Sequence, residues 1–316
     1  MTKAKHRTFF NIFLILTLFL FFFLLKSPVQ ASNAVYNGVM LCLTKVIPSL
    51  FPFLVLNELM LSLGVTRRLG HVFGNLLSKL FNIEKETAVS FICGCLFGFP
   101  LGTRSVVSLY EKGIISKEEA EKAICFCSNT GPAFIIGVVG VSLCNKKIGI
   151  CIYFSQILSA ILIGLKKRNS TPLFFSKSSP KKDEYFSISK VTKAISDSVL
   201  PLLNICAFVC FFSCISGALD NLFSTVGMNE YASFFITGFL EITNGIQIAE
   251  SYGANFISVF FSAFFVGWSG VSVILQSMSV CSKTNINTKK FIASKLLQGI
   301  ICAILSVILC KIFKLY

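Results

Sequence analysis

The sequence predicts an all-α polytopic membrane protein. Hydrophobic residues make up 54% of the 316 positions, charged residues only 14%, and the mean hydropathy is +0.77. A soluble domain carries about 25% charged residues, so most of this chain is too apolar to face water. At least six stretches are long enough to cross about 30 Å of hydrocarbon. Because these stretches are continuously apolar rather than alternating, a membrane β-barrel is not expected.

The N-terminal segment has features of both a membrane span and a signal peptide. Basic residues at positions 3–7 precede an apolar run over residues 9–25, and residues 29–31 would suit signal cleavage. The run is long for a signal peptide, and further spans follow it. We therefore interpret residues 1–33 as an N-terminal transmembrane anchor, with a signal-like segment as the alternative.

The rest of the chain divides into two halves around a linker rich in Ser, Pro and Lys at residues 166–190. The first half, 34–165, contains predicted spans at 39–63, 123–143 and 148–165, an amphipathic segment at 66–86 and a polar segment at 113–122. The second half, 191–316, contains predicted spans at 192–218, 255–280 and 291–310, a polar segment at 219–230 and a basic loop at 282–290. We expect both polar segments to lie in water or at the membrane surface.

Two further apolar runs, at 88–112 and 232–253, are interrupted near their midpoints. The first break is Gly98-Phe-Pro-Leu-Gly102 and the second is Glu241-Ile-Thr-Asn-Gly245. In each half a second interruption follows, at residues 128–132 and 267–270. Interrupted apolar segments at corresponding positions of two halves indicate the binding site of a secondary transporter.

The charge pattern predicts that each broken run is a re-entrant hairpin. If each run returns to the side it entered, each half crosses the membrane three times and the second half is inverted. This topology places 22 of the 29 Lys and Arg residues, Lys295 among them, in or beside cytoplasmic loops, as the positive-inside rule requires. The expected architecture is two inverted repeats, each with a re-entrant hairpin and a broken transmembrane helix. The net charge of +15 is thereby explained without nucleic acid as a partner.

Catalytic and metal-binding patterns are not found in the sequence. Most of the thirteen cysteines lie in apolar runs, and the two histidines, His6 and His71, lie outside the breaks. The sequence contains no Walker-type phosphate loop and no Gly-x-Ser-x-Gly motif. We expect a protein that is not an enzyme and that has no catalytic residues, metal or cofactor.

The breaks provide the candidate binding residues. Unpaired backbone groups within a membrane must be buried in protein or line a cavity, and the N-termini of half-helices favour anions. The predicted substrate-binding residues are Gly98, Pro100, Gly102, Thr103 and Arg104 in the first run, Ser128, Asn129 and Thr130 at the next break, and Glu241, Thr243, Asn244, Trp268 and Ser269 in the second half.

Three of these side chains have alternative interpretations. Arg104 could bind a carboxylate in bidentate fashion, or it could extend to the membrane surface or pair with Glu241. Glu241 could couple the movement of a proton or sodium, or it could be the structural partner of Arg104. Trp268 could stack on a substrate ring or simply fill space.

Several motifs resemble those of the sporulation integral membrane protein family of endospore-forming Firmicutes. They are Pro48-Ser-Leu-Phe-Pro-Phe53, Gly98-Phe-Pro-Leu-Gly102 and Phe126-Cys-Ser-Asn-Thr-Gly-Pro132. The resemblance covers residues 34–310 and is weaker in the second half. It implies a nucleoside-recognition gate domain, distant similarity to concentrative nucleoside transporters, and location in a forespore membrane.

The resemblance also implies a cargo, the aromatic dicarboxylate dipicolinate, carried during sporulation. We therefore predict a transporter of a small organic anion in the cell membrane, with the lipid bilayer and the anion as partners. A nucleoside transporter of the same architecture and a non-transporting scaffold of a sporulation membrane complex are the alternatives. A homo-oligomer is compatible with each of these functions.

Overall fold

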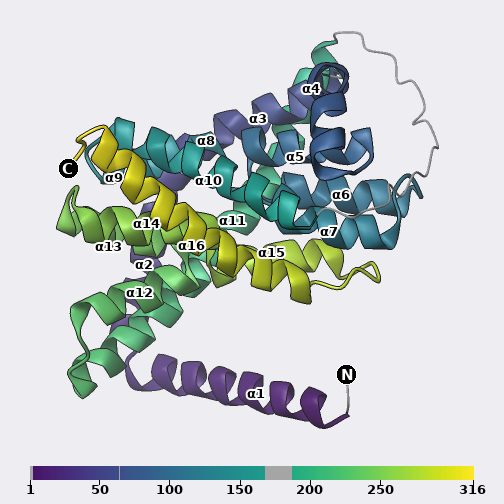
Figure 1. The fold of residues 1–316 in the computed structure, drawn as a ribbon. Coiled ribbons are helices and arrows are strands. Elements are labelled where there is room, and N and C mark those ends of the chain that lie inside the picture. Colours follow the sequence, from purple (N-terminus) through teal and green to yellow (C-terminus); the bar gives the residue numbers. More distant parts are fainter. Residues whose placement is uncertain (1–2, 64, 168–186) are drawn as a thin grey trace.

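The computed structural model describes residues 3–63, 65–167 and 187–316, and in these ranges the regular elements are all helices (Figure 1). Most of the predicted linker lies outside them. Six helices in the described ranges are long and apolar enough to cross a membrane: Pro28–Met60, Lys117–Ser142, Lys146–Lys166, Ile188–Val226, Phe256–Cys281 and Lys289–Ile312. The protein is an integral membrane protein, as the sequence predicts.

The helices follow the predicted order. The first half contains α1 (Lys3–Lys26), α2 (Pro28–Leu41), the π-turn η1 (Cys42–Val46), α3 (Ile47–Ser62), α4 (Val65–Phe81), α5 (Lys85–Phe97), α6 (Leu101–Glu111), α7 (Lys117–Cys127), α8 (Pro132–Phe134), the π-turn η2 (Ile135–Val139), α9 (Gly140–Ser142) and α10 (Lys146–Lys166). The second half contains α11 (Ile188–Val226), α12 (Glu230–Leu240), α13 (Ile242–Tyr252), α14 (Phe256–Trp268), α15 (Gly270–Cys281) and α16 (Lys289–Ile312).

Both interrupted runs form pairs of short helices. We call α5 with α6 the first helix pair, and α12 with α13 the second helix pair. The members of each pair pack on each other. At 1.5 Å per residue, helices of 11 to 13 residues are only about 16–20 Å long, too short to cross the hydrocarbon singly. This length suits a re-entrant hairpin; the re-entrant topology and the inverted repeat stay predictions.

The polar segments of the sequence are largely helical, and the predicted start of the second span was wrong. The second span begins at Pro28 rather than at residue 39, because the polar residues of α2 lie on one helix face and line a pocket. α11 continues to Val226, through the stretch predicted to be a polar segment. α7 begins inside the segment 113–122, and Glu119 is buried there because it accepts hydrogen bonds from Glu84 N and Thr87 Oγ1.

The core is built around α16, which packs on α14, α10 and α7 (Figure 1). α2 and α3 pack along the long helix α11. The N-terminal helix α1 extends away from this bundle along the lower edge of Figure 1, and its Phe23 packs with Ala31 and Ala218. α1 is helical, as predicted for residues 9–25, but the six candidate spans among the described residues do not include it.

The first helix pair is fixed on the end of α7 by two glycines. A Cβ atom added at Gly94 or at Gly102 would lie 1.8 or 1.9 Å from the carbonyl oxygen of Cys127. No side chain fits at either position, so the backbones of α5 and α6 contact the last turn of α7 directly. This contact holds the break of the pair beside the unwound residues that follow Cys127.

Candidate functional site at the helix breaks

The tips of the two helix pairs meet at one cavity. Gly98 and Phe99 line it from the first pair, Glu241 and Thr243 from the second, and Thr130 from the unwound segment after α7. Apolar side chains of α3 and α11 complete the wall. The cavity volume is about 70 Å³, whereas roughly 10–15 Å³ suffices for one water molecule. In this conformation the cavity can hold several waters or a small polar group.

The first break is packed on the unwound segment 128–131. Gly98 has a φ of +79°, a conformation that favours glycine, and a Cβ added there would lie 2.6 Å from Gly131 N. Pro100 follows Phe99 through a cis peptide bond and precedes the first turn of α6. The tip and the unwound segment therefore form a single backbone unit.

The second break contains a carboxylate, that of Glu241. The Glu241 carboxylate accepts a hydrogen bond of 2.7 Å from Asn244 N and one of 3.1 Å from Thr243 Oγ1, at the N-terminus of α13. The residue is 2% exposed. A negative charge at a helix N-terminus is stabilised by the free N–H groups and by the helix dipole. Glu241 thus occupies the position at which a ligand anion would otherwise bind α13.

Each interrupted span donates a hydrogen bond to the first helix of one helix pair, α5 or α12. Asn129 donates to Cys95 Sγ at 3.6 Å, and Trp268 donates from Nε1 to Phe239 O at 2.9 Å. The Trp268 and Phe239 rings also stack, with centroids 4.7 Å apart. In this conformation the Trp268 indole is used within the protein, in accord with the packing interpretation. Ser269 beside it is buried, with no hydrogen-bond partner for its hydroxyl among the described residues.

A buried lysine that the sequence reasoning missed joins the two halves. Lys295 of α16 is fully buried, and its ammonium donates to Ser128 O at 2.9 Å and to Gln298 Oε1 at 2.7 Å. Gln298 in turn donates to Asn129 Oδ1 at 2.9 Å. The ammonium also lies 5.5 Å from the ring centroid of Phe99, the residue that lines the cavity. Both acceptors are neutral groups, so no carboxylate is among these contacts of Lys295.

From the sequence, we expected Lys295 to lie at the edge of the basic loop 282–290. The structure shows instead that Lys295 is buried within the protein, so this prediction was wrong. Lys295 lies within an otherwise apolar run, with Gln298 three positions later on the same helix face. That spacing was the available signal, because a charge inside a membrane helix marks a functional or structural partner. Its partner Ser128 is 167 positions away, so only the fold brings the two together.

Arg104 lies elsewhere than its predicted companion Glu241. It is exposed on α6, and the ion pairs among the described residues do not include an Arg104–Glu241 pair. Arg104 and Asp197 are both within electrostatic range of Glu58 on α3.

The predicted site residues fall into four groups. Gly98, Thr130, Glu241 and Thr243 line the cavity; Ser128 and Asn129 belong to the Lys295 network; Pro100, Gly102, Thr103, Arg104, Trp268 and Ser269 lie outside the cavity lining; and Asn244 faces a second pocket. Thr103 is buried, and its hydroxyl has no partner among the described residues.

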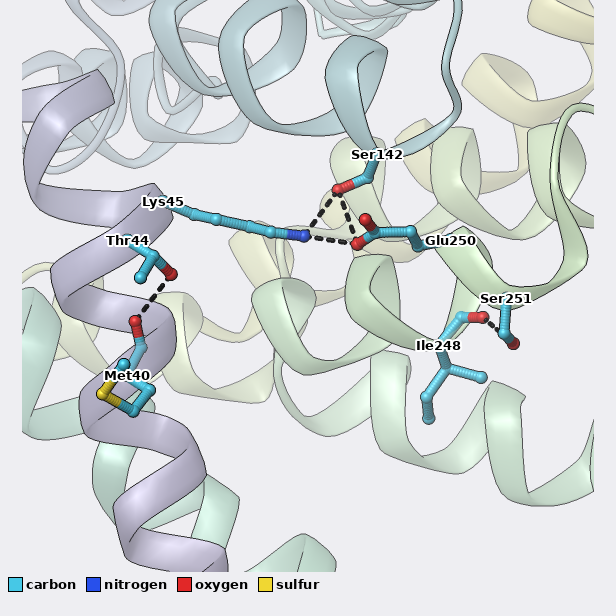
Figure 2. Close-up of polar contacts among 7 residues, drawn as sticks. All are labelled: Met40, Thr44, Lys45, Ser142, Ile248, Glu250 and Ser251. Atoms are coloured by element: carbon cyan, nitrogen blue, oxygen red, sulfur yellow. Dashed lines mark hydrogen bonds and ion pairs between the residues drawn. The ribbon is translucent and has the colours of Figure 1, made fainter.

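Lys45, Ser142 and Glu250 form a polar cluster at the far end of the second helix pair, which we call the latch (Figure 2). The Lys45 ammonium, on η1, forms an ion pair with the Glu250 carboxylate at the end of α13. Ser142, at the end of the first broken span, accepts from Lys45 at 3.1 Å and donates to Glu250 at 3.4 Å. The latch therefore connects the second pair to two elements of the first half.

Comparison with known proteins places the first half of this site in a described domain. Residues 43–147 match the family model Gate, described as nucleoside recognition. This segment runs from η1 through the first helix pair and the first broken span to the start of α10. No solved structure matches the chain significantly.

The whole chain is similar to the sporulation integral membrane protein YlbJ of Bacillus subtilis (strain 168). The two are 26% identical over 343 aligned residues, which cover 95% of this chain and 83% of that protein. The match thus extends well beyond the domain segment and includes the second helix pair. The chain carries a nucleoside recognition gate domain and is a distant homologue of this sporulation integral membrane protein.

Proposed function

We propose that the protein is a membrane transporter of a small organic anion, with dipicolinate as its cargo during sporulation. The observation that carries this proposal is the convergence of both helix-pair tips and an unwound segment on one cavity. Broken helices inside a membrane protein are tolerated where they line a cavity, and substrate sites of transporters lie at such breaks.

A buried amine behind the cavity wall supports an anionic cargo, whereas the one charged residue among the described residues that line the cavity is Glu241. Lys295 does not line the cavity itself, but its side-chain nitrogen lies 5.5 Å from the ring centroid of Phe99, which does. A rotation of the Phe99 side chain would open a path from the cavity to the side-chain nitrogen of Lys295.

The two helix pairs would act as separate gates. The first pair is packed on the end of α7, whereas the second is held at its far end by the latch of Lys45, Ser142 and Glu250. The Lys45 and Glu250 side chains are 29% and 46% exposed, so solvent screens their attraction and the latch can open at modest cost.

One observation favours a nucleoside as the alternative cargo, namely the match of residues 43–147 to a domain described as nucleoside recognition. Uptake of labelled dipicolinate and of labelled uridine into proteoliposomes distinguishes the two. The proposal predicts saturable dipicolinate uptake that excess uridine does not inhibit. Uptake of uridine alone would support the nucleoside transporter, and uptake of neither would support a scaffold.

A further inference from the structure

A second pocket, separate from the cavity at the tips, is lined mainly by polar residues, with Ala34, Gly217 and Ile248 as the apolar ones. α2 contributes Asn37, α11 contributes Ser216 and Asp220, and the second helix pair contributes Thr237 and Asn244. The pocket volume is about 320 Å³. On each of α2 and α11 the polar residues are three or four positions apart, so they lie on one helix face. Asn37 and Asp220 are exposed, so the pocket opens at the surface of the bundle, and Ser216, Thr237 and Asn244 form its buried wall.

Three polar atoms in this pocket have no partner within the described protein. Ser216, Thr237 and Asn244 are only 6%, 2% and 8% exposed, and the two hydroxyl oxygens and the Asn244 Nδ2 atom make no hydrogen bond there. Buried polar groups in native proteins are almost always paired. These three groups therefore need water or a bound species in the pocket.

The charge of the lining selects against an anion. Asp220 is the only charged residue among the described residues that line the pocket, and the other polar groups are hydroxyls and amides. Side-chain oxygens with one carboxylate suit a small cation. The pocket therefore does not suit the cargo proposed for the cavity at the tips.

The pocket lies directly behind the second break. Glu241 N donates to Thr237 O at 2.9 Å, and Asn244 N donates to the Glu241 carboxylate at 2.7 Å. Thr237 and Asn244 thus hold Glu241 through their backbones, while their side chains line the pocket. Glu241 itself lines the cavity at the tips, so the break of the second pair separates the two spaces.

We infer that this pocket is a water-filled binding site for a small monovalent cation. The test distinguishes sodium from hydronium, the two monovalent cations that these oxygen atoms would bind. The role of the cation as the coupling ion rests on the proposed transport function, whereas its binding can be measured without any cargo. A failure of cation binding is therefore distinguishable from a failure of the proposed transport function.

The chain contains a reporter for this test. Trp268 is its only tryptophan, and its indole donates to Phe239 O, two positions before Glu241. We expect its fluorescence in the purified full-length protein to change saturably with NaCl, against choline chloride at constant ionic strength, or with pH from 8 to 5 in choline chloride. A response to sodium identifies a sodium site, and a response to pH alone identifies a proton site.

Matched variants locate the response. Asp220→Asn is expected to raise the half-saturating sodium concentration at least threefold, or to shift the pH midpoint, whereas Asp197→Asn, on the same helix but outside the pocket, has no effect. Thr237→Val is expected to weaken the response and Thr237→Ser to retain it. An unchanged emission in all conditions, or equal behaviour of the two aspartate variants, would overturn the inference.

Discussion

Replacing Lys295 with methionine separates a transport role for this residue from a structural one. The change preserves the approximate side-chain volume but removes hydrogen bonds of 2.9 Å to Ser128 O and 2.7 Å to Gln298 Oε1. Each acceptor left unpaired costs about 1–3 kcal/mol. Removing a buried charge offsets this cost, since replacement of buried ionic groups by apolar ones can stabilise by about 1–4 kcal/mol. We expect the free energy of unfolding to change by less than about 2 kcal/mol.

The effect on transport should be much larger. A hydrogen bond to a charged group contributes about 1.5–3 kcal/mol, which corresponds to about 10- to 150-fold in affinity. Thermal unfolding of the purified variant and dipicolinate uptake per folded protein measure the two effects. Lys122→Met is the matched control, because Lys122 is also buried and donates to Phe81 O and Asn82 O, away from the cavity. Unchanged uptake by folded Lys295→Met protein would refute the reasoning.

Three further substitutions test the gates and the predicted anion contact. Gly102→Ala places a methyl group 1.9 Å from a carbonyl oxygen, so thermal unfolding should show that the free energy of unfolding falls by at least about 1–3 kcal/mol. Gly137→Ala is the control: the nearest atom to its added methyl group lies 3.6 Å away, and its stability should not change. A double-mutant cycle of Lys45→Ala and Glu250→Ala, measured by thermal unfolding, should give a coupling energy of about 0.2–1 kcal/mol. A coupling energy of zero would show that this ion pair does not stabilise the closed position of the second helix pair. Arg104 is exposed outside the cavity lining in this conformation, and its role as an anion contact remains a prediction from the sequence. On that prediction, Arg104→Ala abolishes dipicolinate accumulation without loss of the protein on immunoblots, and normal accumulation would remove Arg104 from the site.

Six spans and the helix breaks could be predicted because local sequence determines them, whereas the seventh predicted span, over residues 9–25, is not among the candidate spans of the described residues. Apolar length defines a span, and Gly98-Phe-Pro and the unwound segment ending at Pro132 interrupt a helix wherever they occur. The self-capping of α13 by Glu241 is also local, since the carboxylate reaches a backbone N–H three positions later.

Long-range contacts account for what the sequence did not show. The polar composition of α2 suggests a loop when the sequence is considered alone. In the structure these residues line a pocket together with α11 and the second helix pair. Lys295 resembles a cytoplasmic charge until α16 crosses the unwound segment at Ser128. In both cases the polar side chain is at a helical position, and its burial depends on a helix from the other half of the chain.

Direct ligand binding tests the central claim, that the cavity between the helix breaks takes a small organic anion. Calorimetric titration of the purified wild-type protein with dipicolinate, uridine and adenosine is the measurement. The account predicts saturable binding of dipicolinate, weakened at least tenfold by Lys295→Met, and no binding of either nucleoside. Binding of a nucleoside without binding of dipicolinate, or binding of none of the three by folded protein, would contradict it.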